Sequence, residues 1–339
     1  MPEQAPRRAV HVVAGLLTDG GRICVTRRRA GVHQGGKWEF PGGKLEAAEE
    51  PLTGLRRELH EELGIDVRAA RPFIKLRHAY ADIDVLLDVW EIVSYRGAPR
   101  GREAQELRWA EIEHLDPREF PEADRPVLRR LQLPPLYVIS DVRRFGADGF
   151  VARLERALAA GARLIQLREP HMARNAFCGY ARRLAGLCRG FGARLLVNAD
   201  PAWVPECGAA GVHLNSRRLM ALCARPLDPP CWIGASCHDE SELAHAQSLA
   251  LDFVVLGPVQ PTASHPASPT LGWERFAMLC SGTALPVYAI GGMGAADFPR
   301  ARAAGAHGLA MISGVWSRDD LETVVRTFAA ADLSVARER

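Results

Sequence analysis

The stretch GKLEAAEEPLTGLRRELHEELGI, residues 43–65, is the most informative part of this 339-residue sequence. Its apolar positions recur at spacings of three and four residues: Leu52, Leu55, Leu59 and Leu63. This period places them on one face of an α-helix, so a helix with one buried side is predicted over residues 51–63.

Three carboxylates occur in the same predicted helix, at Glu58, Glu61 and Glu62. The spacing i, i+3 and i+4 places them on a common face, where like charges repel one another. A solvated acidic surface is one interpretation. The other is a binding site for a hard cation such as Mg²⁺, which prefers oxygen ligands. The preceding FPGGK segment favours the cation, because Gly42 and Gly43 let a backbone carbonyl approach it.

The stretch also fills every specified position of the pattern G-x5-E-x7-R-E-U-x-E-E-x-G-U, in which U is aliphatic. Three further segments surround it: VTRRRAGVHQGGKWEFPGGK (25–44), GREAQELRW (101–109) and FPEADRPVL (120–128). With these motifs, residues 8–131 resemble a Nudix hydrolase, most closely the MutT-type 8-oxo-dGTP diphosphatases. The resemblance implies an α/β/α sandwich.

The resemblance also implies a reaction and a set of site residues. Water would attack the β-phosphorus of a nucleoside triphosphate, releasing a nucleoside monophosphate and pyrophosphate. Mg²⁺ is the implied cofactor, and Mn²⁺ could replace it. Arg57 would orient a carboxylate, and Glu103 would act as a late metal ligand or as the general base. The implied metal ligands are the carbonyl of Gly42 with Glu58, Glu61, Glu62 and Glu103. The implied nucleotide-binding residues are Arg28, Phe40 and Asp124.

Asp124 is a departure from the family pattern, which has asparagine at the position that contacts the base. An amide both donates and accepts hydrogen bonds, whereas an ionised carboxylate only accepts. The oxidised guanine presents N7–H as a donor and O6 as an acceptor. Asp124 would therefore suit both groups only when burial raises its pKa enough to keep it protonated.

A domain boundary is predicted at LQLPPL, residues 131–136, because adjacent prolines interrupt helices and central strands. We expect a Nudix domain over 1–132, a linker over 133–136 and a second domain over 137–339. In the first domain, strands are expected at 9–17, 22–28, 83–92 and 106–112.

The second domain alternates short β-rich runs with helical patterns. The runs lie at 136–141, 163–169, 194–200, 211–214, 232–238, 253–259, 287–293 and 308–314. Helical patterns at 150–162 and 241–251 separate some of them. Eight such units predict a TIM (β/α)₈ barrel, with a doubly wound parallel sheet as the alternative.

The barrel resembles thiamine phosphate synthase and its relative thiazole tautomerase, through QLRE (166–169), VNAD (197–200), GVHL (211–214), GASCH (234–238), GPVQPT (257–262), AIGGM (289–293) and MISG (311–314). The resemblance implies a phosphate cradle at the ends of strands seven and eight, formed by Gly291, Gly292, Ser313 and Gly314. It also implies that His238 corresponds to the proton-transferring histidine of the tautomerase.

Several residues that synthase chemistry requires are absent. Pro170 and His265 replace two lysines, and Ala199 and Arg218 replace two metal-binding aspartates. A degenerate synthase-like barrel is therefore expected. It would act as a tautomerase or as a non-catalytic module that binds a phosphorylated thiazole.

Composition narrows the remaining functional classes. The chain has 43 Lys and Arg against 40 Asp and Glu, a net charge of +3, which argues against nucleic acid as a partner. It has neither a signal-like segment nor an apolar stretch of membrane-spanning length, so we expect a cytoplasmic enzyme with no membrane contact. Its eight dispersed cysteines contain no C-x-x-C pair.

Two hypotheses about the substrate remain open. The hydrolase could remove oxidised nucleotides from the nucleotide pool and so protect DNA replication. Alternatively, fusion to a thiamine-type barrel could direct it to thiamine-related diphosphates.

Overall fold

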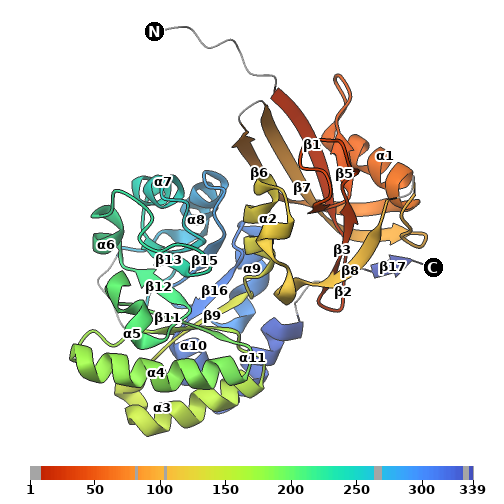
Figure 1. The fold of residues 1–339 in the computed structure, drawn as a ribbon. Helices are drawn as coiled ribbons and strands as arrows, with labels where there is room; N and C mark the ends of the chain where they lie inside the picture. The colour runs from red at the N-terminus through yellow and green to blue at the C-terminus, as the bar shows by residue number, and fades with distance from the viewer. Residues whose placement is uncertain (1–8, 81–82, 103–104, 263–268, 331–335, 339) are drawn as a thin grey trace, which may run out of the picture. The chain divides into compact units, whose positions relative to one another are not determined.

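The computed structural model describes residues 9–80, 83–102, 105–262, 269–330 and 336–338. The chain divides into two compact units between Gln132 and Leu133 (Figure 1). The short strand β17 (Ala336–Glu338) pairs with a strand of the first unit and groups with it. The sequence-based division, by contrast, places all of residues 137–339 in the barrel.

The described residues of the first unit form two β-sheets and two α-helices. One sheet has the order β17-β7-β1-β5, with β6 pairing β7 on its other edge, and the second sheet joins β2, β3, β4 and β8. The first sheet contains β1 (Ala9–Leu16), β5 (Gly42–Lys44), β6 (Asp66–Ala79) and β7 (Asp84–Arg96), together with β17. The second contains β2 (Thr18–Asp19), β3 (Arg22–Arg27), β4 (Trp38–Glu39) and β8 (Leu107–Glu111).

Helix α1 (Pro51–Leu63) coincides with the predicted helix. Pro51 begins it with a φ already suited to a first helical turn, and Gly64 ends it in the left-handed conformation at φ 69°. Leu55, Leu59 and Leu63 are buried and anchor it against the sheets. The carboxylate-bearing face is consequently directed away from this core.

Helix α2 (Arg125–Leu131) belongs to a separate apolar cluster that includes Phe40 and Phe120. It follows three short 3-10 turns, at Ile112–His114, Pro117–Glu119 and Glu122–Asp124. Because α1 and α2 pack in different clusters on the sheets, the unit has the α/β/α layers that were predicted.

The sequence did not predict β6, a strand of 14 residues. Its register against β7 shifts between Val67 and Ala69, between Ala69 and Ala70, and between Pro72 and Ile74. Each irregularity interrupts the alternation of buried and exposed side chains by which a strand is recognised.

The second unit is a closed barrel of eight parallel strands, which confirms the (β/α)₈ prediction over the doubly wound sheet. All eight strands fall in the predicted runs: β9 (Leu136–Ile139), β10 (Leu164–Leu167), β11 (Arg194–Val197), β12 (Gly211–Leu214), β13 (Trp232–Cys237), β14 (Phe253–Leu256), β15 (Val287–Ala289) and β16 (Gly308–Met311). Most of their residues are buried, as in parallel strands covered on both faces.

The helices of this unit are α3 (Val142–Ala159), α4 (Arg174–Gly190), α5 (Val204–Cys207), α6 (Ser216–Met220), α7 (Glu240–Ser248), α8 (Gly272–Ser281), α9 (Phe298–Ala303), α10 (Ser313–Trp316) and α11 (Leu321–Ala330), with 3-10 turns at Pro201–Trp203 and Ala295–Asp297. One apolar cluster lies between strands and helices. A smaller one, with Tyr137, Phe253 and Tyr288, fills the barrel interior.

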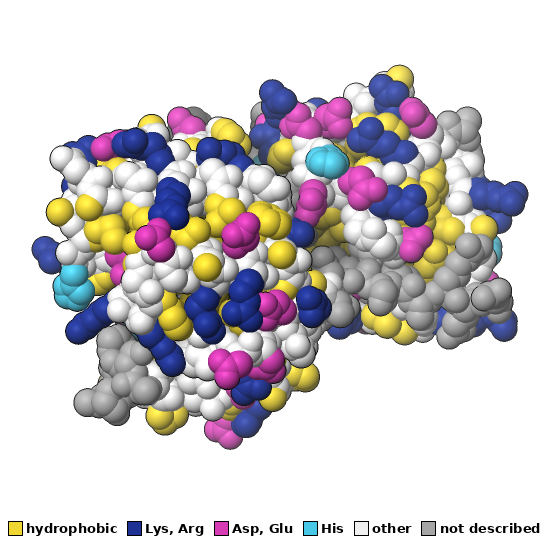
Figure 2. All heavy atoms as spheres, turned by 90° about the horizontal axis from the view of Figure 1, so that it is seen from below, with side chains coloured by type: hydrophobic (Ala, Val, Ile, Leu, Met, Phe, Trp, Pro, Cys, Tyr) yellow, Lys and Arg dark blue, Asp and Glu magenta, His cyan; other side chains and the backbone are white. Residues whose placement is uncertain are grey.

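The surface agrees with the balanced composition. On the face drawn in Figure 2, Lys and Arg side chains are interspersed with Asp and Glu side chains. In the described part of the chain, no helix combines the length and hydropathy needed to cross a bilayer. All eight thiols are free, and six of them are buried.

Candidate active site

The carboxylates of α1 lie directly against the loop that contains Gly42 and Gly43. The backbone N–H of Gly42 donates a hydrogen bond to Glu62 Oε2 at 2.9 Å. A Cβ atom added at Gly43 would overlap the carboxyl group of Glu58. The two glycines therefore allow the backbone to approach the acidic face of the helix closely.

Gly42 is also required by its own conformation. Its φ of 150° is one that other residues rarely adopt, and a Cβ atom there would overlap the carbonyl oxygen of Val13 in β1. The antiparallel register of β1 with β5, in which Ala14 is opposite Gly42, holds the loop in this position.

Arg57 is the centre of an ion-pair network on α1. Its Nε and one terminal nitrogen donate to the two oxygens of Glu49 at 3.0 and 2.9 Å, a bidentate pair that lowers the pKa of Glu49 to about 2. Its other terminal nitrogen donates to Glu58 at 2.9 Å and to Glu61 at 3.3 Å. A single guanidinium thus links the glutamate of the loop to two carboxylates of the helix.

The carboxyl group of Glu62 is more buried than that of Glu61. Burial, together with the nearby charges of Glu39 and Glu58, raises the pKa of Glu62 to about 7. Burial likewise raises the pKa of Glu58, although Arg57 opposes the shift. The Gln105 amide donates to Glu62 Oε1 at 3.5 Å, while its own buried oxygen has no partner among the described residues.

These donors suit a hard divalent cation, although the described residues do not gather three ligands in metal-binding geometry. The donors are carboxylate and amide oxygens, and the pKa values of Glu58 and Glu62 are raised partly by neighbouring negative charge. A bound cation would relieve that repulsion. Glu103, the remaining predicted ligand or base, lies outside the described residues.

The predicted nucleotide-binding residues form a second group near α2, in which Phe40 and Asp124 are buried and Arg28 is partly exposed. Arg28 donates to the carboxylate of Glu39, and its Nε donates to the carbonyl of His33 at 3.1 Å. Asp124 is only 7% exposed, and burial raises its pKa to about 7, although the charge of Arg28 acts in the opposite direction. Phe40 packs 5.8 Å from Phe120 between ring centroids.

The predicted barrel residues lie at the carboxyl ends of their strands. Gly291 and Gly292 follow β15 with φ values of 107° and 63°, which glycine adopts without strain. Gly314 lies against the same loop, because a Cβ atom there would overlap the carbonyl of Met293. Ser313 precedes Gly314 at the start of α10. The structure therefore brings the cradle residues of β15 and β16 together.

His238 follows β13 and is exposed. Its Nδ1 lies 2.9 Å from Glu242 Oε2, and the same carboxylate oxygen accepts a hydrogen bond from the His238 backbone N–H at 2.7 Å.

Comparison with known proteins assigns the two units separately. A NUDIX domain model matches residues 12–130, and a thiamine monophosphate synthase model matches residues 136–315. The 8-oxo-dGTP diphosphatase of Escherichia coli is 34% identical over 126 residues, which cover 37% of this chain and 98% of that protein. A putative thiamine-phosphate synthase of Geobacter sulfurreducens is 37% identical over 197 residues, covering 58% and 92%.

The chain belongs to both families. Among solved structures, the thiamine phosphate pyrophosphorylase of Pyrococcus furiosus aligns with 60% of this chain and 96% of its own, with a TM-score of 0.51 and 26% identity. The first unit is thus a Nudix hydrolase domain, and the second is a thiamine-phosphate-synthase-like barrel.

The barrel interior contains a polar network that the sequence reading missed. Tyr137 accepts a hydrogen bond from Gln166 at 2.9 Å and lies 3.3 Å from His213 Nδ1, while His213 Nε2 lies 2.9 Å from Ser236. Asn198 donates to Gln166 at 3.4 Å. Burial lowers the pKa of His213 to about 3, so the ring is neutral. The sequence signal that could have predicted this network is the presence of polar residues within strand segments that are otherwise apolar.

The residues at the positions that correspond to functional residues of the synthases have other surroundings here. Asp200, the remaining aspartate of VNAD, accepts a hydrogen bond from the backbone of Ala202 at 2.9 Å and caps a 3-10 turn. Ala199 is buried. His265 lies outside the described residues.

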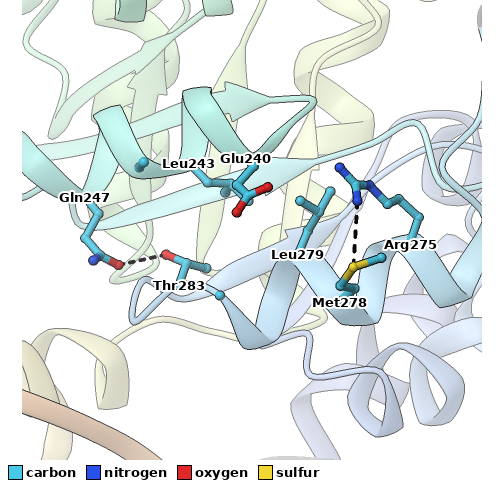
Figure 3. Close-up of a pocket in the computed structure, with 9 residues that line it drawn as sticks. Glu240, Leu243, Gln247, Arg275, Met278, Leu279 and Thr283 are labelled. Atoms are coloured by element: carbon cyan, nitrogen blue, oxygen red, sulfur yellow. Dashed lines mark hydrogen bonds between the residues drawn. The ribbon is translucent and has the colours of Figure 1, made fainter.

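The described residues of the barrel unit form, among others, two cavities. The smaller, of about 180 Å³, is formed by helices α7 and α8 and the turn after α8, where Thr283 donates to Gln247 at 3.1 Å (Figure 3). The larger, of about 860 Å³, lies at the carboxyl ends of β9, β10 and β16. Barrel enzymes place their active sites at that end of the strands, so the larger cavity is the candidate ligand site.

Proposed function

We propose that the Nudix domain hydrolyses 8-oxo-dGTP to 8-oxo-dGMP and pyrophosphate. The observation that carries the proposal is the network in which Arg57 holds Glu49, Glu58 and Glu61 beneath the loop at Gly43. The likeness to the 8-oxo-dGTP diphosphatase of E. coli supports the choice of substrate.

The Nudix residues divide the chemistry between them. Mg²⁺, or Mn²⁺ in its place, would be held by Glu58, Glu61, Glu62, Glu103 and the Gly42 carbonyl, and when bound it neutralises phosphate charge and lowers the pKa of bound water. Arg57 positions two of the carboxylates through charge-assisted hydrogen bonds. Glu103 is the proposed base that takes the proton of the attacking water.

Asp124 is the proposed base-reading residue. With its pKa raised to about 7 by burial, a large fraction of the carboxyl is protonated at neutral pH. The protonated acid donates to the guanine O6 and still accepts from N7–H, as the amide of asparagine does. Phe40 would border the base, and Arg28, which pairs with Glu39, would face the nucleotide.

A substrate panel tests the proposal. In the presence of Mg²⁺, kcat/KM should be highest for 8-oxo-dGTP, lower for dGTP, and lowest for thiamine diphosphate. Asp124→Asn should widen the ratio of 8-oxo-dGTP to dGTP, since a hydrogen bond to a buried group contributes about 1–3 kcal/mol. A preference for thiamine diphosphate would instead support the alternative substrate class, and an unchanged ratio would show that Asp124 does not contact the base.

We further propose that the barrel binds a phosphorylated thiazole without catalysing thiamine phosphate synthesis. The juxtaposition of Gly291, Gly292 and Gly314 supports phosphate binding through backbone N–H groups. A tautomerase activity remains a second candidate, favoured by the pairing of His238 with Glu242. If Nδ1–H donates to that carboxylate, Nε2 is left unprotonated and can accept a proton.

The two candidates for the barrel are separated by one pair of measurements. Calorimetric titration with thiazole phosphate should show binding, and a product assay in parallel should show whether the ligand is isomerised. Loss of isomerisation in His238→Gln with binding retained would support the tautomerase, whereas binding with no turnover in the native protein would support a binding module.

A further inference from the structure

Two buried cysteines of the barrel unit lie in contact with each other. Cys178 is in α4 and Cys207 is the last residue of α5, and both side chains are buried. The Cys207 thiol donates a hydrogen bond to Cys178 Sγ, with the two sulfur atoms 3.3 Å apart. Because the sulfur atoms are already in contact, a small side-chain movement would bring them to bonding distance.

The two thiols have different surroundings. Cys178 accepts the hydrogen bond from Cys207, and it also interacts with Arg174, one helical turn earlier in α4. The pKa of Arg174 is raised chiefly by its hydrogen bond to Glu206 and, to a smaller extent, by Cys178. A neighbouring cation and a donated hydrogen bond both favour the thiolate form, so Cys178 is the more nucleophilic sulfur of the pair.

Cys207 is the thiol that keeps its proton. Burial, followed by the hydrogen bond to Cys178, raises the pKa of Cys207. Cys188, also in α4, provides a comparison, because burial raises its pKa to about 12 although the charge of Arg189 acts in the opposite direction. A buried thiol of this kind is protonated at neutral pH and unreactive. The pair therefore combines a sulfur that favours the thiolate form with a protonated thiol beside it.

The short helix α5 controls access to the pair. It has four residues, Val204–Cys207, and ends at Gly208 with φ 60°. Glu206 attaches it to α4 through an ion pair with Arg174 at 3.0 Å, and through its carbonyl, which accepts a hydrogen bond from Arg182 Nε at 2.8 Å. The side chains of Arg174 and Glu206 are 56% and 37% exposed, and exposed ion pairs contribute little stability. Because α5 is short and held partly by such contacts, it opens at a lower free energy than the whole barrel, and a small oxidant can then reach the sulfurs.

We propose that Cys178 and Cys207 are a modification site at which hydrogen peroxide forms a reversible disulfide between α4 and α5. Cys178 reacts first with the peroxide, and Cys207 then resolves the product. The bond would fix the segment after β11 against α4, where Trp203 already packs 6.0 Å from Phe177 between ring centroids. The site contains none of the residues proposed to bind the nucleotide or the thiazole phosphate, so it goes beyond both proposed functions.

The proposed reaction is a balanced two-electron exchange. The Cys178 thiolate attacks one peroxide oxygen, the O–O bond breaks, and a sulfenic acid and hydroxide form. The hydroxide takes the Cys207 proton to give water, and the Cys207 thiolate attacks the Cys178 sulfur. The S–S bond forms as the S–O bond breaks, and the departing hydroxide takes up the proton that Cys178 released to solvent. Two thiols are thus oxidised to a disulfide while the peroxide is reduced to two water molecules.

Peroxide treatment of the full-length protein, followed by peptide mass spectrometry, tests the proposal. The reduced protein is treated with hydrogen peroxide, the remaining thiols are blocked with N-ethylmaleimide in denaturant, and tryptic peptides are analysed with and without dithiothreitol. A peptide that links Cys178 to Cys207 should form at least about tenfold faster than Cys188 is oxidised, and dithiothreitol should release it. Absence of this link, or preferential pairing of either cysteine with a different one, would overturn the proposal.

Two cysteine variants separate the roles of the sulfurs. Cys207→Ala should leave Cys178 as a sulfenic acid that dimedone traps, whereas Cys178→Ala should leave Cys207 unmodified. Circular dichroism of each variant reports whether it is folded. Dimedone labelling of Cys207 in place of Cys178 would refute the assigned order of reaction.

An arginine variant tests why Cys178 reacts first. Arg174→Gln should slow the oxidation of Cys178 several-fold, because the thiolate loses its neighbouring cation. If Arg174 only held α5 in place, its removal would instead expose the pair and speed the reaction, which would contradict the role assigned to it. Arg183→Gln, which changes an exposed arginine of α4 that pairs with Asp148, is the matched control and should leave the rate unchanged.

Discussion

At the scale of single residues, the most consequential feature is burial of acidic side chains. Glu39, Glu62 and Asp124 all have pKa values raised to about 7, with burial as the first cause in each. Arg28 donates a hydrogen bond to Glu39, whereas Arg57 contacts Glu58, the neighbour of Glu62 on the same helix. Buried carboxyls reduce the stability of the folded state when they ionise, and perturbed pKa values of this kind are typical of binding and catalytic sites.

The carboxylate of Glu62 provides a test that separates function from stability. Glu62→Gln removes a proposed metal ligand, so turnover should fall by at least about 10²-fold. The free energy of unfolding should not decrease, since a neutral amide replaces a buried acid. Turnover is measured across a Mg²⁺ titration, and stability by urea denaturation. Glu50→Gln, an exposed neighbour outside the network, is the control, and normal turnover in Glu62→Gln would disprove the ligand assignment.

Asp124 predicts a particular dependence of stability on pH. Its pKa is raised from 3.8 to about 7 in the folded state, so between these values the folded protein holds a proton that the unfolded chain has released. Stability should therefore decline as pH rises through this window and level off above it. Asp124→Asn cannot ionise, so it should be more stable than the native protein by roughly 1–3 kcal/mol at pH 8.

Asp116 is the control for this experiment, because its pKa is shifted in the opposite direction to that of Asp124. Arg118 holds the pKa of Asp116 below its usual value, so that carboxylate stabilises the fold above its unfolded pKa and the contribution is lost in acid. Asp116→Asn should therefore be slightly destabilising at pH 8. Urea midpoints at pH 4 and pH 8 measure both. Equal effects of Asp124→Asn at the two pH values would contradict the raised pKa.

At the scale of structural elements, the acidic face of α1 packs against a loop whose conformation requires glycine at position 42. Gly42→Ala should lower the melting temperature, because the new Cβ meets the Val13 carbonyl and the φ of 150° is strained, at a cost of roughly 1–3 kcal/mol. Gly20→Ala is the matched control, since Gly20 also has a positive φ but has open space around it. Similar losses in both would show that conformation alone, rather than the close approach, makes Gly42 necessary.

Helices and strands could be predicted where the spacing of apolar residues along the chain is regular, and were missed where it is not. The spacing of the leucines located α1 correctly, and continuous apolar runs located all eight barrel strands. Strand β6 was missed because its irregular register against β7 breaks the alternation. Helix α3 begins earlier than the predicted pattern, because it includes a kink at Gly146 where φ is 71°.

At the scale of the whole molecule, two families with separate chemistries share one chain. We predict that the full-length protein forms no detectable thiamine phosphate from the pyrimidine diphosphate and thiazole phosphate. The leaving pyrophosphate needs a metal held by carboxylates, and Ala199 and Arg218 occupy those positions. A chromatographic product assay measures this, with a thiamine-phosphate synthase as the positive control. Robust product formation would refute the loss of synthase chemistry.

Motifs and strands could be found from the sequence because their signals lie within a few residues of chain, where spacing alone determines which side chains share a face. The pairing of Arg57 with Glu49 and the burial of Asp124 depended on the tertiary structure. The placement of Arg143 and Arg168 in the lining of one cavity also depended on the tertiary structure. The physical reason is that burial and electrostatic interaction depend on distance in space, and folding brings these residues together from separate elements.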